Sequence, residues 1–133
     1  KKKAMNTPYH LGLALLRVGT SALMLTHGYG KFMKLFSGEE IQFMNFLGLG
    51  PTISLGLTAL GEFIIPIIII VGFKTRLMAI FPAITMFVAA FVAHAGDPLS
   101  QKEMSLLYLI MFTSIALLGG GKFSLDGVLQ KNK

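Results

Sequence analysis

Four apolar stretches, each near the length of a membrane-crossing helix, constrain the fold of this chain more than any other feature. They cover about residues 8–29, 52–73, 77–95 and 102–119. A helix needs about 20 predominantly apolar residues to cross roughly 30 Å of hydrocarbon. The fourth stretch reaches that length only if Gln101 or Lys102 begins its helix. The sequence therefore predicts an all-α fold, in which residues 1–133 form a single polytopic membrane domain built as a four-helix bundle.

Composition supports the membrane class and excludes several others. Hydrophobic residues make up 53% of the chain and charged residues only 14%, whereas soluble domains carry about 25% charged residues. So few charges cannot cover a water-soluble surface, which excludes a soluble nucleotide-binding domain and a disordered tail. The chain has no cysteine, which excludes a disulfide scaffold, thiol catalysis, cysteine-ligated iron–sulfur clusters and covalent haem attachment.

The net charge of +6 is distributed as in a membrane protein. The cations form short blocks between apolar stretches and match no nucleic-acid-binding module, so we expect no nucleic-acid partner. With a cytoplasmic N-terminus, eight lysines and arginines lie inside and three lie outside. That excess obeys the positive-inside rule and predicts that both termini are cytoplasmic. The inside cations are Lys1, Lys2, Lys3, Lys74, Arg76, Lys122, Lys131 and Lys133, and the outside ones are Lys31, Lys34 and Lys102.

The basic start followed by an apolar run also resembles a signal peptide. However, the run is longer than a usual signal-peptide core, contains Arg17 and reaches HGYGKF without a small-x-small cleavage site. These features favour an uncleaved first span.

The segment between the first two spans is too long for a tight turn and too apolar for a free loop. Ser37 and Glu40 have the spacing of a capping box, and Ile41, Met44 and Leu47 recur at helical intervals. This pattern predicts a short amphipathic helix over about 38–48 that lies flat in the interface. An ordinary capped connector is the alternative interpretation.

Two ionisable residues, Arg17 and Glu62, fall inside apolar stretches, where an unpaired charge costs several kcal/mol. Counted from the cytoplasmic side, Arg17 lies about 14 Å into the first span and Glu62 about 18 Å into the second. Because these spans run antiparallel, we predict a buried Arg17–Glu62 ion pair. The pair has either a purely structural role, fixing helix register, or lines a ligand cavity.

A second polar group is expected at the outer edge of the bundle. His27 and His94 both reach this edge, bordered by Lys31, Asp97 and Glu103. Such a group can bind a metal, a quinone head group or a proton in transit, or it is simply solvated at the interface. Haem ligation by the two histidines fits poorly, since both lie at the edge rather than inside the bundle. Tyr108 on the fourth span can point its hydroxyl into the bundle.

With these motifs in place, the chain resembles the DoxX family of small four-helix bacterial and archaeal membrane proteins. The resemblance covers nearly the whole chain and rests on LLRVGTSALMLTHGYGKF, LTALGEFIIPIIIIVGFKTRLMA, HAGDPL, EMSLLYLIMF and GGGKFSLDGVL, in that order. It implies that the family's recurring polar positions are Arg17, His27, Lys31, Glu62, Thr75, Arg76, Glu103, Tyr108, Ser124 and Asp126. It also implies a location in the cytoplasmic (inner) membrane of a prokaryote.

Some members of this family are membrane subunits of thiosulfate:quinone oxidoreductases, and others accompany oxidative-stress or sulfur-handling enzymes. Because this chain lacks cysteine, sulfur chemistry would need another subunit. The resemblance and the polar residues together predict a redox-associated, quinone-facing subunit of a quinone-linked oxidoreductase. It would carry no metal and no covalently bound cofactor, and quinone is its candidate ligand. The candidate binding residues are Arg17, His27, Lys31, Glu62, His94 and Tyr108.

Two other functions fit the same sequence. The small size and the small residues of the third span are also typical of a non-catalytic structural or assembly subunit of a larger membrane complex. A small-molecule or proton transporter is the third hypothesis, although no inverted repeat is evident. The expected partners are the lipid bilayer, subunits of a redox or other membrane complex, and further copies of this chain.

Overall fold

The computed structural model describes residues 2–131, and no β-strand occurs among them. Three of the described helical segments are long and apolar enough to cross a membrane: Pro51–Val71, Thr75–Ala93 and Leu99–Leu118. They correspond to the second, third and fourth stretches of the sequence, so the all-α membrane class is confirmed. The first stretch lies within α1 (Lys2–Leu35), a helix of 34 residues that begins well before Pro8.

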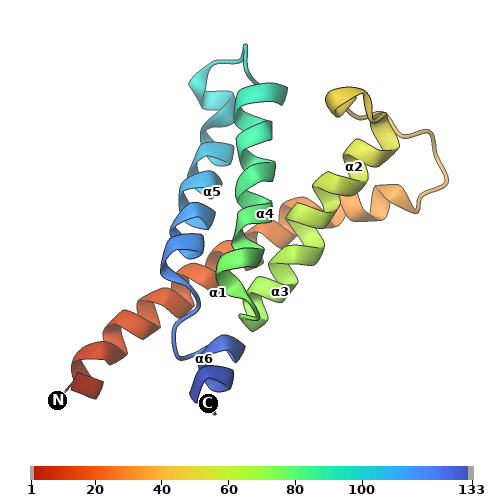
Figure 1. The fold of residues 1–133 in the computed structure, drawn as a ribbon. Coiled ribbons are helices and arrows are strands. Elements are labelled where there is room, and N and C mark those ends of the chain that lie inside the picture. Colours follow the sequence, from red (N-terminus) through yellow and green to blue (C-terminus); the bar gives the residue numbers. More distant parts are fainter. Residues whose placement is uncertain (1, 132–133) are drawn as a thin grey trace.

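The helices form a splayed bundle (Figure 1). α4 (Thr75–Val88) and α5 (Leu99–Leu118) lie side by side, and α1 runs obliquely across the molecule. α3 (Ile65–Val71) packs against α1 and α4, whereas α2 (Pro51–Ala59) leans away from α4. Both marked chain ends lie at the end of the molecule that contains the α3–α4 turn (Figure 1).

A π-turn, η2 (Leu60–Ile64), joins α2 to α3 within one continuous helical segment. Its cause is Pro66, which has no N–H to donate to the carbonyl of Glu62, and whose ring would clash with that carbonyl in a regular α-helix. The chain widens instead, and the N–H of Ile65 donates to the carbonyl of Leu60. Such π-turns occur frequently at functional sites, and this one contains Glu62.

A second π-turn, η3 (Ala89–Ala93), continues α4 at the end remote from the α3–α4 turn. There the N–H of His94 donates to the carbonyl of Ala89 at 3.0 Å. The wide turn changes the direction in which the last residues of this helix face, so that Ala89 and Ala93 border the same cavity as η2.

The α3–α4 connection is a tight turn fixed by backbone conformation. Gly72 ends α3 in the left-handed region at φ 82°, and the N–H groups of Gly72 and Phe73 both donate to the carbonyl of Ile68. Lys74, which precedes α4, is also left-handed at φ 47°. A side chain at position 72 would collide with Ser124, so this turn requires glycine for both its φ and its packing.

The amphipathic helix predicted over about 38–48 does not form. Residues 38–45 have no helical conformation, and Phe46–Gly48 makes a single 3₁₀ turn (η1). The Ser37 hydroxyl does not begin a capping box, because it donates to the carbonyl of Lys34 and accepts from the N–H of Glu39. Left-handed φ angles at Gly38, Leu47 and Gly48 then prevent a regular helix.

The buried core is apolar and lies where α1, α3, α4 and α5 meet. Most of its members are large apolar side chains, and one is an alanine of α4. The members are Met24, Ile65, Ile69, Ala79, Met86, Tyr108, Phe112 and Ile115.

Candidate functional site

Glu62 is buried in the π-turn η2 and is neutralised by a lysine of α1. The ammonium of Lys31 donates to both carboxylate oxygens, at 2.8 Å each. The Glu62 side chain is 3% exposed, whereas that of Lys31 is 36% exposed. An isolated carboxylate at this depth would cost several kcal/mol. The ion pair therefore offsets the cost of burying the Glu62 carboxylate. Because the Lys31 side chain is partly exposed, a ligand can still reach the ammonium.

Close approach of two backbones places the pair. Gly28 packs directly against the backbone of Glu62, where a Cβ atom would overlap its carbonyl oxygen. That carbonyl is the one that Pro66 leaves without its helical donor. Lys31 follows Gly28 by three residues, so it lies on the same face of α1, nearly one turn further along. The glycine thus allows α1 to approach near enough for the lysine to reach the carboxylate.

The Lys31–Glu62 pair lies at an apolar slot of about 520 Å³. The slot is bordered by both π-turns, by α2 and α4, and by the connector before α2. Most of its walls are hydrocarbon, and its polar groups are few. The lining includes Lys31, Phe43, Met44, Phe46, Ser54, Leu57, Thr58, Glu62, Phe81, Ile84, Thr85, Ala89, Ala93 and His94. An apolar cavity of this size with a few convergent polar groups is typical of a small-molecule binding site.

His94, at the far end of η3, borders the slot. Its Nδ1 lies 2.7 Å from a carboxylate oxygen of Asp97. The Asp97 carboxylate thereby orients the imidazole and favours a proton on Nδ1. In residues 2–131, no three His, Asp or Glu side chains come close enough together to hold a metal ion.

His27 and Tyr108 form a separate pair between α1 and α5. Their ring centroids lie 5.6 Å apart in an edge-to-face arrangement, and Tyr108 also stacks on Phe112. Tyr108 is buried, whereas His27 is exposed. Neither residue lines the slot, so the structure does not bring His27 and His94 into one outer-edge site.

Arg17 is buried near the opposite end of the bundle, where its guanidinium holds three chain segments together. One terminal nitrogen donates to the carbonyl of Gly120 at 2.7 Å, and the other donates to Phe123 at 2.9 Å and to Ile70 at 3.4 Å. Arg17 is 3% exposed. The planar fork of a guanidinium suits this role, because it can satisfy several acceptors at fixed angles.

The predicted Arg17–Glu62 ion pair is wrong. The prediction assumed that Pro8 and the α3–α4 turn lie at the same depth, but Arg17 itself lies level with that turn, beside Ile70. The residue of α1 that lies level with Glu62 is Gly28, about 16 Å further along the helix. The long, oblique course of α1 shifts the register, so Glu62 pairs with Lys31 instead.

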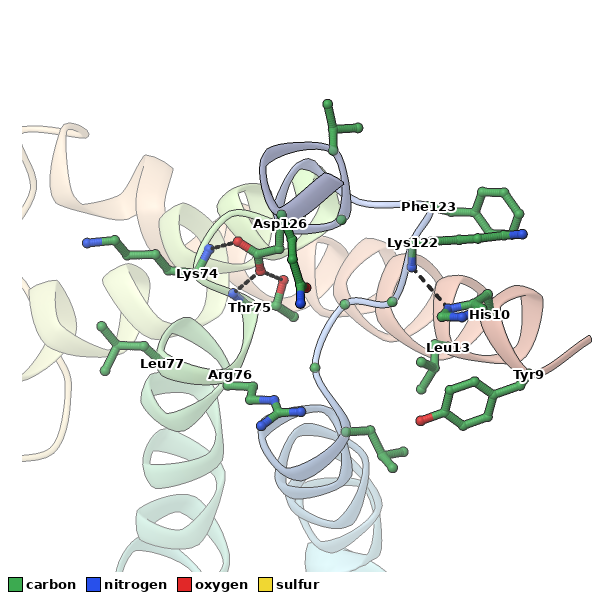
Figure 2. Close-up of a pocket in the computed structure, with 17 residues that line it drawn as sticks. Tyr9, His10, Leu13, Lys74, Thr75, Arg76, Leu77, Lys122, Phe123 and Asp126 are labelled. Carbon is green, nitrogen blue, oxygen red and sulfur yellow. Dashed lines mark hydrogen bonds between the residues drawn. The ribbon is translucent and has the colours of Figure 1, made fainter. Parts of the chain in front are cut away.

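Asp126 is a structural residue that the site prediction did not include. Its carboxylate accepts from the N–H groups of Lys74 and Thr75, at 2.7 and 2.8 Å, and from the Thr75 hydroxyl at 2.7 Å (Figure 2). Burial alone would raise the pKa of Asp126. The hydrogen bonds from Thr75 and Lys74 and the nearby charge of Arg17 outweigh it and lower the pKa below its usual 3.8. The ionised carboxylate thus caps the N-terminus of α4.

The capping role had a weak signal in the sequence. Asp126 belongs to the GGGKFSLDGVL motif, and its partners Lys74 and Thr75 belong to VGFKTRLMA. The two motifs lie about 50 residues apart, and nothing in their spacing shows that the last segment returns to the α3–α4 turn. A polar residue shortly after an apolar span is equally typical of a solvated helix end.

Comparisons with known proteins agree with the fold and with the motifs. The sequence profile of the DoxX family matches residues 12–95. The chain is 29% identical over 130 residues to "Putative oxidoreductase CatD" of Bacillus subtilis, covering 97% of this chain and 95% of that one. It is 30% identical over 127 residues to "Inner membrane protein YqjF" of Escherichia coli, covering 91% and 94%. No solved structure matches. On the extent of these matches, the chain is a member of the DoxX family of membrane proteins.

Proposed function

We propose that this protein is a quinone-facing, redox-associated subunit of the prokaryotic cytoplasmic membrane. The observation that carries the proposal is the apolar slot of about 520 Å³ that contains the Lys31–Glu62 pair. A quinone needs a flat hydrocarbon-lined space for its ring and tail, and donors for its carbonyl oxygens. The slot offers aromatic and aliphatic walls together with one ammonium, one carboxylate and one imidazole.

The three polar groups have distinct roles in this proposal. The Lys31 ammonium has three N–H donors and is partly exposed, so it supplies a hydrogen bond to a quinone carbonyl. Glu62 balances its charge. His94, oriented by Asp97, supplies an imidazole that can form a hydrogen bond with the second quinone carbonyl. Because the chain contains no cysteine, we assign the thiol chemistry of any linked sulfur substrate to a partner subunit.

The membrane arrangement belongs to the same proposal. We propose that α1 crosses the bilayer as a fourth span, with both termini in the cytoplasm as the charge distribution favours. The names of the relatives support the setting, since one is called an oxidoreductase and the other an inner membrane protein. Their chains match this one over nearly their full length.

Binding of a short-tailed quinone to the purified protein in nanodiscs tests the proposal. Ala93→Phe places a ring in the slot and should abolish saturable binding, whereas Ala22→Phe, an exposed alanine of α1 outside the slot, should leave it unchanged. Lys31→Met should weaken binding about tenfold, as expected for the loss of a charged hydrogen bond.

Two results would refute the quinone assignment. One is the absence of quinone both from lipid extracts of the purified protein and from the titrations. The other is equal binding by the Ala93→Phe and Ala22→Phe variants. If quinone is absent and the protein co-purifies reproducibly with other membrane subunits from native cells, the structural or assembly function replaces the quinone proposal.

A further inference from the structure

A second cavity, at the opposite end of the bundle, has the chemistry of an anion site. It has a volume of about 1080 Å³ and lies between the start of α1, the start of α4 and the segment that follows α5 (Figure 2). We infer that this groove binds the phosphate group of an anionic phospholipid. The slot at Lys31 and Glu62 shares none of its lining residues, so the inference is independent of the proposed function.

The charge of the groove is positive. Lys74, Arg76 and Lys122 line it, together with His10. Among the described residues, Asp126 is the one acid of the lining. Its two oxygens already accept from the N–H groups of Lys74 and Thr75 and from the Thr75 hydroxyl. The carboxylate is therefore directed at the start of α4, and within residues 2–131 it forms no ion pair with Lys74, Arg76 or Lys122. The three cations of the lining outnumber this acid.

Arg76 is the central cation. It is exposed, and within residues 2–131 its guanidinium forms no hydrogen bond or ion pair. The side chain lies directly over Gly119, where an added Cβ would lie 2.9 Å from Nε. Figure 2 shows the guanidinium pointing toward the end of α5 and the Tyr9 hydroxyl pointing toward the same segment from the other side. A guanidinium with free donors matches the geometry of a phosphate.

The glycine segment supplies backbone donors beside this cation. Gly119 and Gly121 adopt φ angles of 82° and 75°, which other residues rarely adopt. Within the described chain, the N–H groups of Gly120 and Gly121 donate no hydrogen bond. Successive free N–H groups in such a turn are typical of anion-binding backbone.

The position of the groove favours a lipid as the source of the phosphate. Two candidate spans meet here, since Thr75–Ala93 begins and Leu99–Leu118 ends at its wall. Tyr9 and Phe123 flank it, as aromatic residues do at the level of lipid head groups. Lys74 and Lys122 extend over the rings of Phe73 and Phe123 and place two more cations at the rim. Basic pockets between spans at this level are typical binding sites for anionic head groups.

Native mass spectrometry of protein released from vesicles of equal parts phosphatidylglycerol and phosphatidylcholine tests the inference. The unmodified protein should retain phosphatidylglycerol in preference to phosphatidylcholine. Arg76→Gln should lower that retention about fivefold, as expected for the loss of one interfacial cation. Lys122→Gln should lower it as well. Lys34→Gln removes the same charge at the other end of α1, where the Lys34 ammonium donates to the carbonyl of Gln42, and should have no effect.

Inorganic phosphate, added to the detergent-purified protein, distinguishes the two sources of the same group. Protection from thermal unfolding that Arg76→Gln abolishes, without any preference for phosphatidylglycerol, would keep the phosphate site but overturn the lipid assignment. Equal retention of phosphatidylglycerol by all variants, with no phosphate effect, would overturn the site itself. Because Arg76 is exposed, we expect Arg76→Gln to fold, and an unchanged melting temperature without phosphate or lipid serves as its control.

Discussion

The Lys31 ammonium lies 2.8 Å from each carboxylate oxygen of Glu62, across a contact between α1 and the π-turn η2 that only a glycine at position 28 permits. This relationship connects the packing of the bundle to its candidate ligand slot. The same pair balances a buried charge and presents a hydrogen-bond donor to the cavity.

Replacing one residue of the Lys31–Glu62 pair should destabilise the protein more than replacing both. Lys31→Met should lower the free energy of unfolding by about 3 kcal/mol, the low end for a buried pair because the ammonium is partly exposed. The double variant Lys31→Met, Glu62→Leu should recover part of that loss, since no charge remains buried. Thermal melts in detergent measure both effects. A double variant that is no more stable than Lys31→Met alone would show that removing the Glu62 charge does not compensate for loss of the lysine.

Gly28→Ala should destabilise the bundle by separating α1 from η2. The new methyl would overlap the Glu62 carbonyl, and overpacking of this kind costs about 1 to 3 kcal/mol. The matched control is Gly30→Ala on the same helix, where an added Cβ would meet no atom of the described residues within 4 Å. That change should be neutral or stabilising by up to about 1 kcal/mol. Equal melting temperatures for both variants would contradict the close contact.

Arg17→Lys should also destabilise the protein, by about 2 to 3 kcal/mol, because an ammonium cannot reach all the carbonyls that the guanidinium holds. Its effect should add to that of Glu62→Gln within about 0.5 kcal/mol, as for residues without shared partners. A double-mutant cycle measures this additivity. A coupling free energy well above that range would show that Arg17 and Glu62 do interact.

Stability should fall in acid through Asp126. Because the folded state lowers the pKa of Asp126 below 3.8, the carboxylate contributes stability at pH values above the unfolded pKa. That contribution is lost as the pH falls through the lower, folded value. Asp126→Asn should lower the free energy of unfolding at pH 7 by about 1 to 2 kcal/mol, as for loss of a helix cap.

Melting temperatures measured between pH 7 and pH 3 check this behaviour. The difference between the unmodified protein and Asp126→Asn should shrink toward the acid end. A constant difference across this range would mean that the carboxylate contributes no pH-dependent stability. Glu39→Gln, at an exposed acid of the connector before α2, is the matched control.

The helices were readable from the sequence because their length and hydropathy are local properties. The third and fourth stretches, expected at 77–95 and 102–119, correspond to Thr75–Ala93 and Leu99–Leu118. The prediction of a helix in the connector between α1 and α2 was wrong because Ser37 forms a local turn instead of a helix cap. Its capping-box spacing is compatible with both conformations, so the pattern alone could not decide between them.

The site was harder to predict, since it depends on the register between helices. Lys31, Glu62 and His94 were all candidate residues and all line the slot. The sequence does not predict how these residues are arranged, because counting residues gives their depth in the membrane only if the helices are parallel. The oblique course of α1 (Figure 1) brings Gly28 level with Glu62, and tilt of this kind arises from packing between helices.

The return of the last segment to Arg17 has a consequence for biosynthesis. The carbonyls of Gly120 and Phe123 that receive the guanidinium follow it by 103 and 106 residues, so these two acceptors leave the ribosome long after Arg17 itself. Until synthesis is nearly complete, water or the insertion machinery must accommodate the charge. A chain released before Gly120 would retain only the 3.4 Å hydrogen bond from Arg17 to Ile70 and would leave most donors of this buried guanidinium without a protein acceptor.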